Sequence, residues 1–230
     1  MSATLGTPRL HHRVTDSTSD LARALASAGA PHGTLVTAGA QRAGRGRQGR
    51  TWSAPPGRAL LMSLVLREWP ALLPIAAAAA VADVAGASAA IKWPNDVLLD
   101  GRKLAGILAE GRPQEGWAVL GIGINVAVRL DDLPPELHGR AATLGLEPAA
   151  IEPTLEALLH ALEQRLAQPT GEALDAVRAR DALHGRRVRW ARGEGVACGI
   201  DDAGRLLVKP ARAADPVALD AGEVHLLPDP

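Results

Sequence analysis

The sequence contains no phenylalanine and no tyrosine, so its only aromatic residues besides histidine are five tryptophans. The interior must therefore be packed from aliphatic side chains, chiefly alanine and leucine. The single cysteine, Cys198, excludes an internal disulfide. The sequence also lacks a secretory leader at its start and, around residues 70–92, an uninterrupted apolar span long enough to cross a membrane. We expect a cytoplasmic protein with no membrane partner.

Neither sign of charge is in excess, because 25 Lys and Arg residues balance 25 Asp and Glu residues. A chain of zero net charge creates no long-range basic field of the kind that attracts proteins to nucleic acid. The seven histidines are scattered, with only His11 and His12 adjacent, so no metal-ligand spacing emerges. At 230 residues the chain is long enough for one substantial domain, with or without a small companion.

The order of predicted elements indicates a mixed α+β fold. Ser17 is a good helix N-cap, Gly29 is a good helix stop, and Asp100-Gly101 suits a type I′ hairpin turn. Helices are predicted over 17–28, 72–84 and 151–182, and strands over 34–37, 59–66, 97–99, 103–108 and 117–126. Because helices do not alternate regularly with strands, a mixed sheet with helices packed on it is favoured over repeated βαβ units.

From about Gly185 onward the pattern changes to short strands. They are predicted at 187–190, 195–200, 205–208 and 223–227, with a turn at Asp202-Ala203-Gly204. Such a run predicts a small β-barrel or sandwich attached to the main domain. We place the boundary after residue 183, which gives a main domain over 1–183 and a small β domain over 184–230.

A glycine-rich loop over residues 41–52 carries the strongest functional signal. Three arginines are interleaved with three glycines, and Trp52 closes the segment. The arginines are Arg45, Arg47 and Arg50, and the glycines are Gly44, Gly46 and Gly49. Guanidinium groups on a loop with this much backbone freedom suit an anionic ligand that orders the loop around itself. The pattern predicts a clamp over an anion.

A second polar cluster is predicted around the hairpin. Lys92-Trp93-Pro94-Asn95-Asp96 precedes it, and Arg102-Lys103-Leu104-Ala105-Gly106 follows its turn. The fold-back brings Asn95, Asp96 and Lys103 near one pocket, a trio that suits phosphate and Mg²⁺ handling. Gly106 lies in an apolar strand where a ligand can approach closely. The alternative is that these are solvated edge residues and ordinary turn formers.

Two further segments give weaker signals. Gly121-Ile122-Gly123-Ile124-Asn125 lacks the third glycine of a dinucleotide fingerprint and lies within a predicted strand, so we reject a Rossmann site there. Its glycines are predicted to face packed neighbours in the sheet, while Asn125 can offer a donor and an acceptor to a base. Asp16-Ser17-Thr18-Ser19 is either a helix cap alone or a helix start that binds a small polar ligand.

Taken in order, these segments resemble the biotin protein ligase family, the enzymes that attach biotin to carboxylases. The matching segments are 16–18, 41–52, 92–96, 102–106 and 121–125, followed by Gly204 and Gly222-Glu223-Val224. The arginine-glycine loop and the Lys-Trp-Pro-Asn-Asp segment are specific as a pair. The resemblance implies a mixed-sheet catalytic domain of the class II synthetase and biotin ligase type, with a C-terminal SH3-like β-barrel.

The resemblance also implies roles for individual residues. The implied biotin-binding residues are Ser17, Thr18, Ser19, Gln41, Gly44, Arg45, Gly46, Arg47, Lys103 and Gly106. The implied nucleotide-binding residues are Arg50, Trp52, Asn95, Lys103 and Asn125. The implied catalytic residues are Lys103, Arg47 and Asp96, and Asp96 is also the implied Mg²⁺ contact. Ser19 stands where the family often has asparagine, which puts its own ligand contact in question.

By the same resemblance, the expected reaction uses ATP and Mg²⁺ to form biotinyl-AMP and then transfers biotin to a lysine of a biotin carboxyl carrier protein, a subunit of acetyl-CoA carboxylase. The protein is expected to be a monomer or a homodimer. No DNA binding is expected, because only fifteen residues precede Asp16, too few for a helix-turn-helix module. Two alternatives stay open: a lipoate or octanoate ligase or transferase of the same fold, and an arginine-glycine loop that binds nucleic acid.

Overall fold

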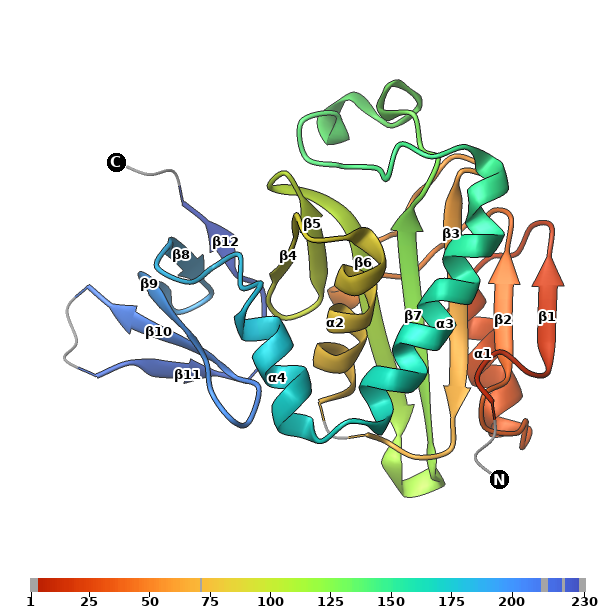
Figure 1. Cartoon of the computed structure of the whole chain (residues 1–230), viewed down its shortest axis with the longest axis horizontal. Helices are drawn as coiled ribbons and strands as arrows, with labels where there is room; N and C mark the ends of the chain where they lie inside the picture. The colour runs from red at the N-terminus through yellow and green to blue at the C-terminus, as the bar shows by residue number, and fades with distance from the viewer. Residues whose placement is uncertain (1–3, 71, 212–214, 221, 228–230) are drawn as a thin grey trace.

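The computed structural model describes residues 4–70, 72–211, 215–220 and 222–227, and its largest element is a seven-stranded sheet (Figure 1). The strand order is β1-β2-β3-β7-β6-β5-β4, with β1 and β2 parallel and every other neighbouring pair antiparallel. The strands are β1 (Arg9–His12), β2 (Leu35–Ala38), β3 (Ala59–Leu66), β4 (Ala89–Lys92), β5 (Asp96–Leu99), β6 (Arg102–Arg112) and β7 (Trp117–Asn125). The predicted mixed sheet is confirmed.

Two of these strands escaped sequence-based prediction. β1 is a polar, mostly exposed strand at one edge of the sheet, so it carries no apolar alternation. β4 lies at the other edge and consists of two alanines, an isoleucine and a lysine, a composition with weak strand preference. Their strand conformation comes from pairing with β2 and β5 rather than from their own residues.

Helices cover both faces of the sheet (Figure 1). α1 (Thr18–Ser27) packs on one face, where Ala22 and Ala26 contact Val65 and Val119. α2 (Leu73–Ala85) and α3 (Ile151–Ala167) cover the opposite face, and α2 is buried along most of its length, as its alanine-rich sequence predicts. Within the described ranges, no helix combines the length and the apolar character needed to span a membrane.

The helix predicted over 151–182 is wrong as a single element. The structure divides it into α3 and α4 (Thr170–Arg178). Pro169 lies at the break, and Gln168 before it is extended, with φ −74° and ψ 154°. A proline disfavours helical backbone in the residue that precedes it, so the chain turns at this point.

The alternation of side chains along β7 places apolar residues on one face of the sheet and glycines on the other. On β7 the even-numbered residues of 118–124 join the apolar core beneath α2 and α3. Gly121 and Gly123 face the opposite side, where an added Cβ would lie 2.7 Å from Ser19 Oγ and 2.5 Å from Trp52 Cε2, respectively. The prediction that these glycines face packed neighbours is confirmed.

A second, antiparallel sheet follows α4, with strand order β11-β10-β9-β8-β12. Its strands are β8 (Arg187–Trp190), β9 (Gly193–Ile200), β10 (Leu206–Pro210), β11 (Val217–Leu219) and β12 (His225–Leu226). The predicted small β unit is confirmed, but among the described residues no ladder joins β11 to β12, so the sheet is open rather than a closed barrel. The domain boundary after residue 183 stays a prediction.

Candidate active site

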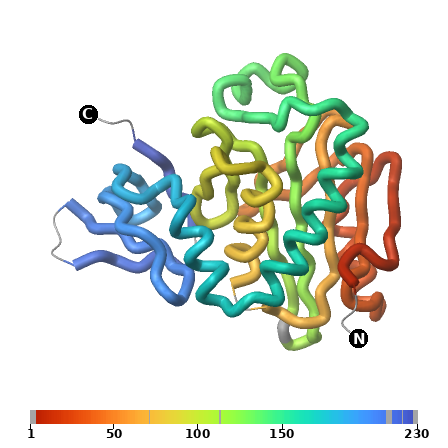
Figure 2. Tube along the Cα trace, viewed as in Figure 1, coloured from red at the N-terminus to blue at the C-terminus, as the bar shows by residue number. Residues whose placement is uncertain are grey.

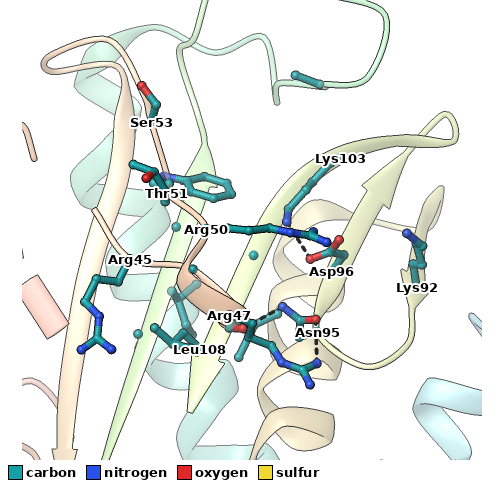
Figure 3. Close-up of a pocket in the computed structure, with 18 of the residues that line it drawn as sticks. Arg45, Arg47, Arg50, Thr51, Ser53, Lys92, Asn95, Asp96, Lys103 and Leu108 are labelled. Carbon is teal, nitrogen blue, oxygen red and sulfur yellow. Dashed lines mark hydrogen bonds and ion pairs between the residues drawn. The ribbon is translucent and has the colours of Figure 1, made fainter. Parts of the chain in front are cut away.

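A cavity of about 600 Å³ lies where the 41–52 loop meets the β5–β6 hairpin (Figure 3), and residues 222–226, which end in β12, also line it. Its volume is in the range of small-molecule sites. All predicted site residues except Ser17 and Gly44 line it. These are Thr18, Ser19, Gln41, Arg45, Gly46, Arg47, Arg50, Trp52, Asn95, Asp96, Lys103, Gly106 and Asn125. Their individual roles toward biotin or nucleotide stay predictions.

Ser17 and Gly44 support the cavity from behind. Ser17 Oγ accepts a hydrogen bond from Asp20 N at 3.3 Å, so Ser17 is the N-cap of α1. Ser17 is also buried, with 1% of its surface exposed. Gly44 O accepts from Trp52 N at 2.8 Å, which closes the loop. A Cβ at Gly44 would lie 2.4 Å from Trp52 O, so only glycine permits this approach.

A chain of polar side chains forms one wall. Thr18 donates twice to Gln41 Oε1, from its backbone N at 2.8 Å and from Oγ1 at 3.0 Å. Ser63 Oγ donates to Thr18 Oγ1 at 2.9 Å and lies 3.1 Å from Ser19 Oγ. Because Gln41 Oε1 already accepts two hydrogen bonds from Thr18, the Gln41 side chain faces a ligand mainly through its NH₂ group, which is a donor. Sequence reasoning missed Ser63, although a single polar residue in the apolar run of β3 was an available signal.

Trp52 covers the floor of the cavity. Gly106 and Gly123 are paired across β6 and β7, and added Cβ atoms there would lie 3.1 Å and 2.5 Å from the Trp52 ring. Lys103 Nζ lies 5.7 Å from the centre of the same ring. Trp52 Nε1 is buried and has no hydrogen-bond partner among the described residues, so it is a donor that a ligand can use.

The predicted fold-back of the hairpin is confirmed. Lys103 Nζ lies 2.7 Å from Asp96 Oδ1, as Figure 3 shows. Asn95 Nδ2 donates to Ile107 O at 3.0 Å, and its Oδ1 accepts from Arg47 Nη1 at 3.1 Å. The hairpin and the glycine-rich loop are therefore joined by side chains that the two sequence motifs supply.

The three loop arginines do not point the same way. Arg47 lies beside Asn95, and Arg50 forms an ion pair with Glu223 of the second sheet. Arg45 extends away from Asp96 and Lys103 in Figure 3 and pairs with Asp20 and Glu110 at 2.9 Å and 2.8 Å. Two of the three guanidinium groups thus lie on the hairpin side of the loop.

Positive charge exceeds negative charge along the cavity. Among the described lining residues six are cationic and two are acidic. The cationic residues are Arg45, Arg47, Arg50, Lys92, Lys103 and Arg140, and the acidic residues are Asp96 and Glu223. Because Asp20 and Glu110 outside the lining balance Arg45, positive groups exceed negative groups by three, and in a partly enclosed space this excess attracts a ligand with several negative charges.

Burial makes the charged form of two of these cations more costly. It lowers the pKa of Arg47, and it lowers the pKa of Lys92, where Asp96 opposes the effect and Lys103 reinforces it. The pKa of His225 is lowered by burial and then by the nearby cations, beginning with Lys92, which favours a neutral imidazole at pH 7. An anion in the cavity would stabilise the charged forms of Arg47 and Lys92 and offset the cost of removing them from water.

Four charged or titratable residues among the described lining were missed as site residues: Lys92, Arg140, Glu223 and His225. Lys92 was part of a recognised motif. Arg140 comes from the long connection after β7, which passes over the end of the sheet (Figure 2). Its backbone O accepts from Lys103 N at 2.7 Å, so this segment is held beside β6. No local pattern in the sequence marks Arg140 or His225.

The two carboxylates that line the cavity are too few to hold a metal ion by themselves, so a bound ligand would have to supply further oxygen atoms. Within the part of the chain that the structure describes, no group of three or more His, Cys, Asp or Glu side chains could hold a metal. Asp96 and Glu223 are each paired with a cation, Lys103 and Arg50. Mg²⁺ commonly takes one carboxylate together with phosphate and water oxygens, and Asp96 fits that arrangement.

The chain is similar in sequence to proteins of one known family. The family described as "Biotin/lipoate A/B protein ligase family" matches residues 11–127, which include both motif regions. The bifunctional ligase/repressor BirA of Bacillus subtilis is 41% identical over 152 residues, covering 61% of this chain and 47% of the relative. The chain thus spans about half the length of that relative.

Two other relatives match over nearly the whole chain. The biotin--[acetyl-CoA-carboxylase] ligase of Mycobacterium tuberculosis is 35% identical over 231 aligned positions, covering 90% of this chain and 85% of the relative. The solved structure of the biotin protein ligase of Aquifex aeolicus in complex with biotin and ATP matches with a TM-score of 0.82 and 25% identity. That match covers 97% of this chain and all of the other.

Proposed function

The chain belongs to the biotin/lipoate A/B protein ligase family, and from this premise we propose that it activates biotin with ATP and transfers it to a lysine of a biotin carboxyl carrier protein. One observation carries the proposal: lysine and arginine side chains from the loop, the hairpin and the connection after β7 converge on a single cavity. An acid and a nucleotide are both anions, and joining them needs this kind of environment.

In the first step, a biotin carboxylate oxygen attacks the α-phosphorus of ATP, and pyrophosphate leaves. Lys103 is the proposed contact for the reacting carboxylate and α-phosphate, and Arg47 contributes a second fixed positive charge. Because these groups are already held by Asp96 and Asn95, little rearrangement is needed as negative charge develops. When bound, Mg²⁺ would neutralise phosphate charge, with Asp96 as its protein contact.

The product, biotinyl-AMP, is a mixed anhydride that water hydrolyses. The 41–52 loop is proposed to cover it, since the loop lies along the cavity, while the Trp52 ring on the sheet glycines forms the floor beneath it. In the second step the neutral amine of an acceptor lysine attacks the acyl carbon, and AMP leaves. We also propose that Thr18, Ser19, Gln41 and Gly106 surround the biotin ring system, with Ser17 and Gly44 supporting them from behind, while Asn125 lies along the nucleotide.

The test uses the purified chain with biotin, ATP and Mg²⁺, followed by native mass spectrometry. A tightly held species with the mass of biotinyl-AMP is the expected result. Parallel samples contain lipoate or octanoate in place of biotin, because the family description includes lipoate. Preferential retention of lipoyl-AMP or octanoyl-AMP would assign a different acid, and no adenylate with any acid would contradict the proposal.

The acceptor, the location and the assembly are parts of the same proposal. The acceptor is proposed to be the carrier protein of acetyl-CoA carboxylase, because the similar Mycobacterium tuberculosis protein is a biotin--[acetyl-CoA-carboxylase] ligase. We propose a cytoplasmic enzyme, a monomer or homodimer, that does not bind DNA. A gel shift with biotin and ATP that retains DNA in a sequence-specific way would contradict the last point.

A further inference from the structure

Four polar side chains in one wall of the cavity form a chain of hydrogen bonds in which the position of every hydroxyl hydrogen follows from its neighbour. Thr18 and Ser19 are the first two residues of α1, and Gln41 follows β2. These three residues line the cavity. Ser63 lies in β3, is 0% exposed and is not among the described lining residues, so no role in the proposed chemistry falls to it.

The direction of the chain is set at Gln41. The backbone N–H of Thr18 can only donate, and it lies 2.8 Å from Gln41 Oε1, so the amide oxygen rather than the NH₂ group must occupy this position. Thr18 Oγ1 lies 3.0 Å from the same oxygen. Because an amide oxygen can only accept, the hydroxyl hydrogen of Thr18 points to Gln41.

The two serines then have one arrangement each, since a hydroxyl group has a single hydrogen. Thr18 has already used its hydrogen, so it accepts from Ser63 at 2.9 Å. Ser63 has thereby used its own hydrogen, so Ser19 is the donor across the 3.1 Å between Ser19 Oγ and Ser63 Oγ. The Ser19 hydroxyl therefore offers only lone pairs to the cavity.

A glycine on the neighbouring strand makes room for this arrangement. Gly121 of β7 is paired with Ser63 of β3, and an added Cβ there would lie 2.7 Å from Ser19 Oγ. Any side chain at Gly121 would thus displace the Ser19 hydroxyl from Ser63. Two strands and the start of α1 together hold the hydroxyl groups in line.

We propose that Ser63 is a positioning residue that takes up the hydrogen of Ser19 and thereby selects an acid whose far end carries N–H donors. The ureido ring of biotin has two N–H groups, whereas an octanoyl chain and the dithiolane ring of lipoate have none. A site built to hydrogen-bond such groups discriminates strongly against ligands that lack them. The inference rests on the proposed function and names how the site chooses its acid.

The first experiment measures binding of biotin and of desthiobiotin, which keeps the ureido ring, to Ser63→Ala by titration calorimetry. The variant frees the Ser19 hydrogen to turn toward the ligand, where it meets an N–H donor and removes an acceptor. Both dissociation constants are expected to rise about tenfold. In biotin-dependent ATP–pyrophosphate exchange the KM for biotin should rise by a similar factor, while kcat and the KM for ATP stay within about twofold, because the reacting groups are untouched.

A ligand without N–H groups separates this role from general damage to the site. Octanoate at high concentration should drive exchange equally well in the native protein and in Ser63→Ala. The matched control is Thr34→Val, which removes another buried hydroxyl, one that donates to Pro31 O at 2.8 Å. Thr34 is not among the described lining residues, so this variant should bind biotin with native affinity whatever its melting temperature.

Two further variants keep the test sharp. Ser63→Cys preserves the shape of the side chain but has a weaker donor, so the loss of biotin affinity should be smaller, about two- to fivefold. This variant carries the test if Ser63→Ala does not fold. Ser19→Ala removes the acceptor itself, and combined with Ser63→Ala it should lose less than the product of the two single losses, because both changes act on one contact.

The outcomes separate the two proposals. Native biotin affinity in the Ser63 variants, an equal loss with octanoate, or fully multiplicative losses in the double variant would overturn the role of Ser63 and leave the proposed function standing. A native protein that binds octanoate or lipoate but not biotin would count against the proposed function, and against this selection of the acid with it.

Discussion

Gly106 and Gly123 show how single residues shape the cavity. They face each other across β6 and β7, and the Trp52 ring rests on both. Any side chain at Gly123 would displace the ring, since a Cβ there would lie 2.5 Å from Trp52 Cε2. The alternation of glycine and isoleucine along β7 thus combines an open floor on one face with a packed core on the other.

Lys103 offers the sharpest residue-scale prediction. Lys103→Ala removes the cation next to Asp96 and should reduce biotin-dependent ATP–pyrophosphate exchange by at least about a hundredfold, because the negative charge of the reacting groups is no longer balanced. Circular dichroism should show a native fold. Lys209→Ala on β10, an exposed lysine outside the cavity, is the control and should exchange at the native rate. Ordinary exchange by Lys103→Ala would remove this lysine from the mechanism.

Arg47 is expected to affect retention of the adenylate more than its formation, because Lys103 remains as the main proposed contact for the reacting groups. Its guanidinium joins the loop to Asn95 of the hairpin, so Arg47→Ala should still form adenylate but release it about tenfold or more faster. Release is measured by trapping free biotinyl-AMP after rapid dilution. Arg42→Ala, an exposed arginine at the foot of the loop, should release at the native rate. An unchanged release rate in Arg47→Ala would contradict the clamp.

Among the elements, the helices behind the sheet are joined by one carboxylate. Asp83 near the end of α2 accepts from Arg165 of α3 at 2.8 Å and from Arg180 after α4 at 2.7 Å. Burial alone raises the pKa of Asp83, but the hydrogen bonds and charges of the two arginines outweigh it, and the net pKa is lowered. A carboxyl group of this kind stabilises the fold above its unfolded pKa and loses that contribution as the pH falls through its folded pKa.

Asp83→Asn is therefore expected to lower the free energy of unfolding by about 1–3 kcal/mol at pH 7, because it leaves two partly buried arginines without their carboxylate. The difference from the native protein should shrink as the pH falls below about 4, the unfolded pKa of aspartate. Urea unfolding at pH 7 and pH 3 measures both values. Asp175→Asn, whose side chain is 76% exposed, is the control. Equal stability of Asp83→Asn and the native protein at pH 7 would contradict the assignment.

On the scale of the whole molecule, the two sheets share one core. Val188, Leu206 and Val208 of the second sheet belong to the same buried cluster as the residues beneath α2 and α3. Trp93 Nε1 donates to Gly204 O at 2.9 Å, which adds a polar contact between the two units. The second sheet also completes the cavity, because Glu223 and His225 line it.

A shared core predicts cooperative unfolding. We expect a single urea transition in which circular dichroism and tryptophan fluorescence coincide. Native-state hydrogen exchange should give amides of β9 and β10 about the same opening free energy as amides of β3 and β7. Two separated transitions, with the second sheet opening first, would show that the units are independent.

The sequence by itself determined what depends on neighbours along the chain. The strand over 59–66, the cap at Ser17 and the turn at Asp100-Gly101 were predictable, since each follows from local apolar runs, capping or positive-φ preference. So were the two polar motifs and the approach of Lys103 to Asp96, because a hairpin's fold-back is itself local. The meeting of the 41–52 loop with the hairpin is not local, since Arg47 and Asn95 are 48 residues apart in the sequence.

Tertiary structure decided what depends on residues far apart. β1, β4 and β11 form because neighbouring strands pair with them, and Arg140 and His225 reach the cavity from segments with no pattern of their own. It also turned Arg45 toward Asp20 and Glu110, which no spacing in the chain reveals. The physical reason is that burial and ion pairing act between groups that are close in space, and only the complete fold sets those distances.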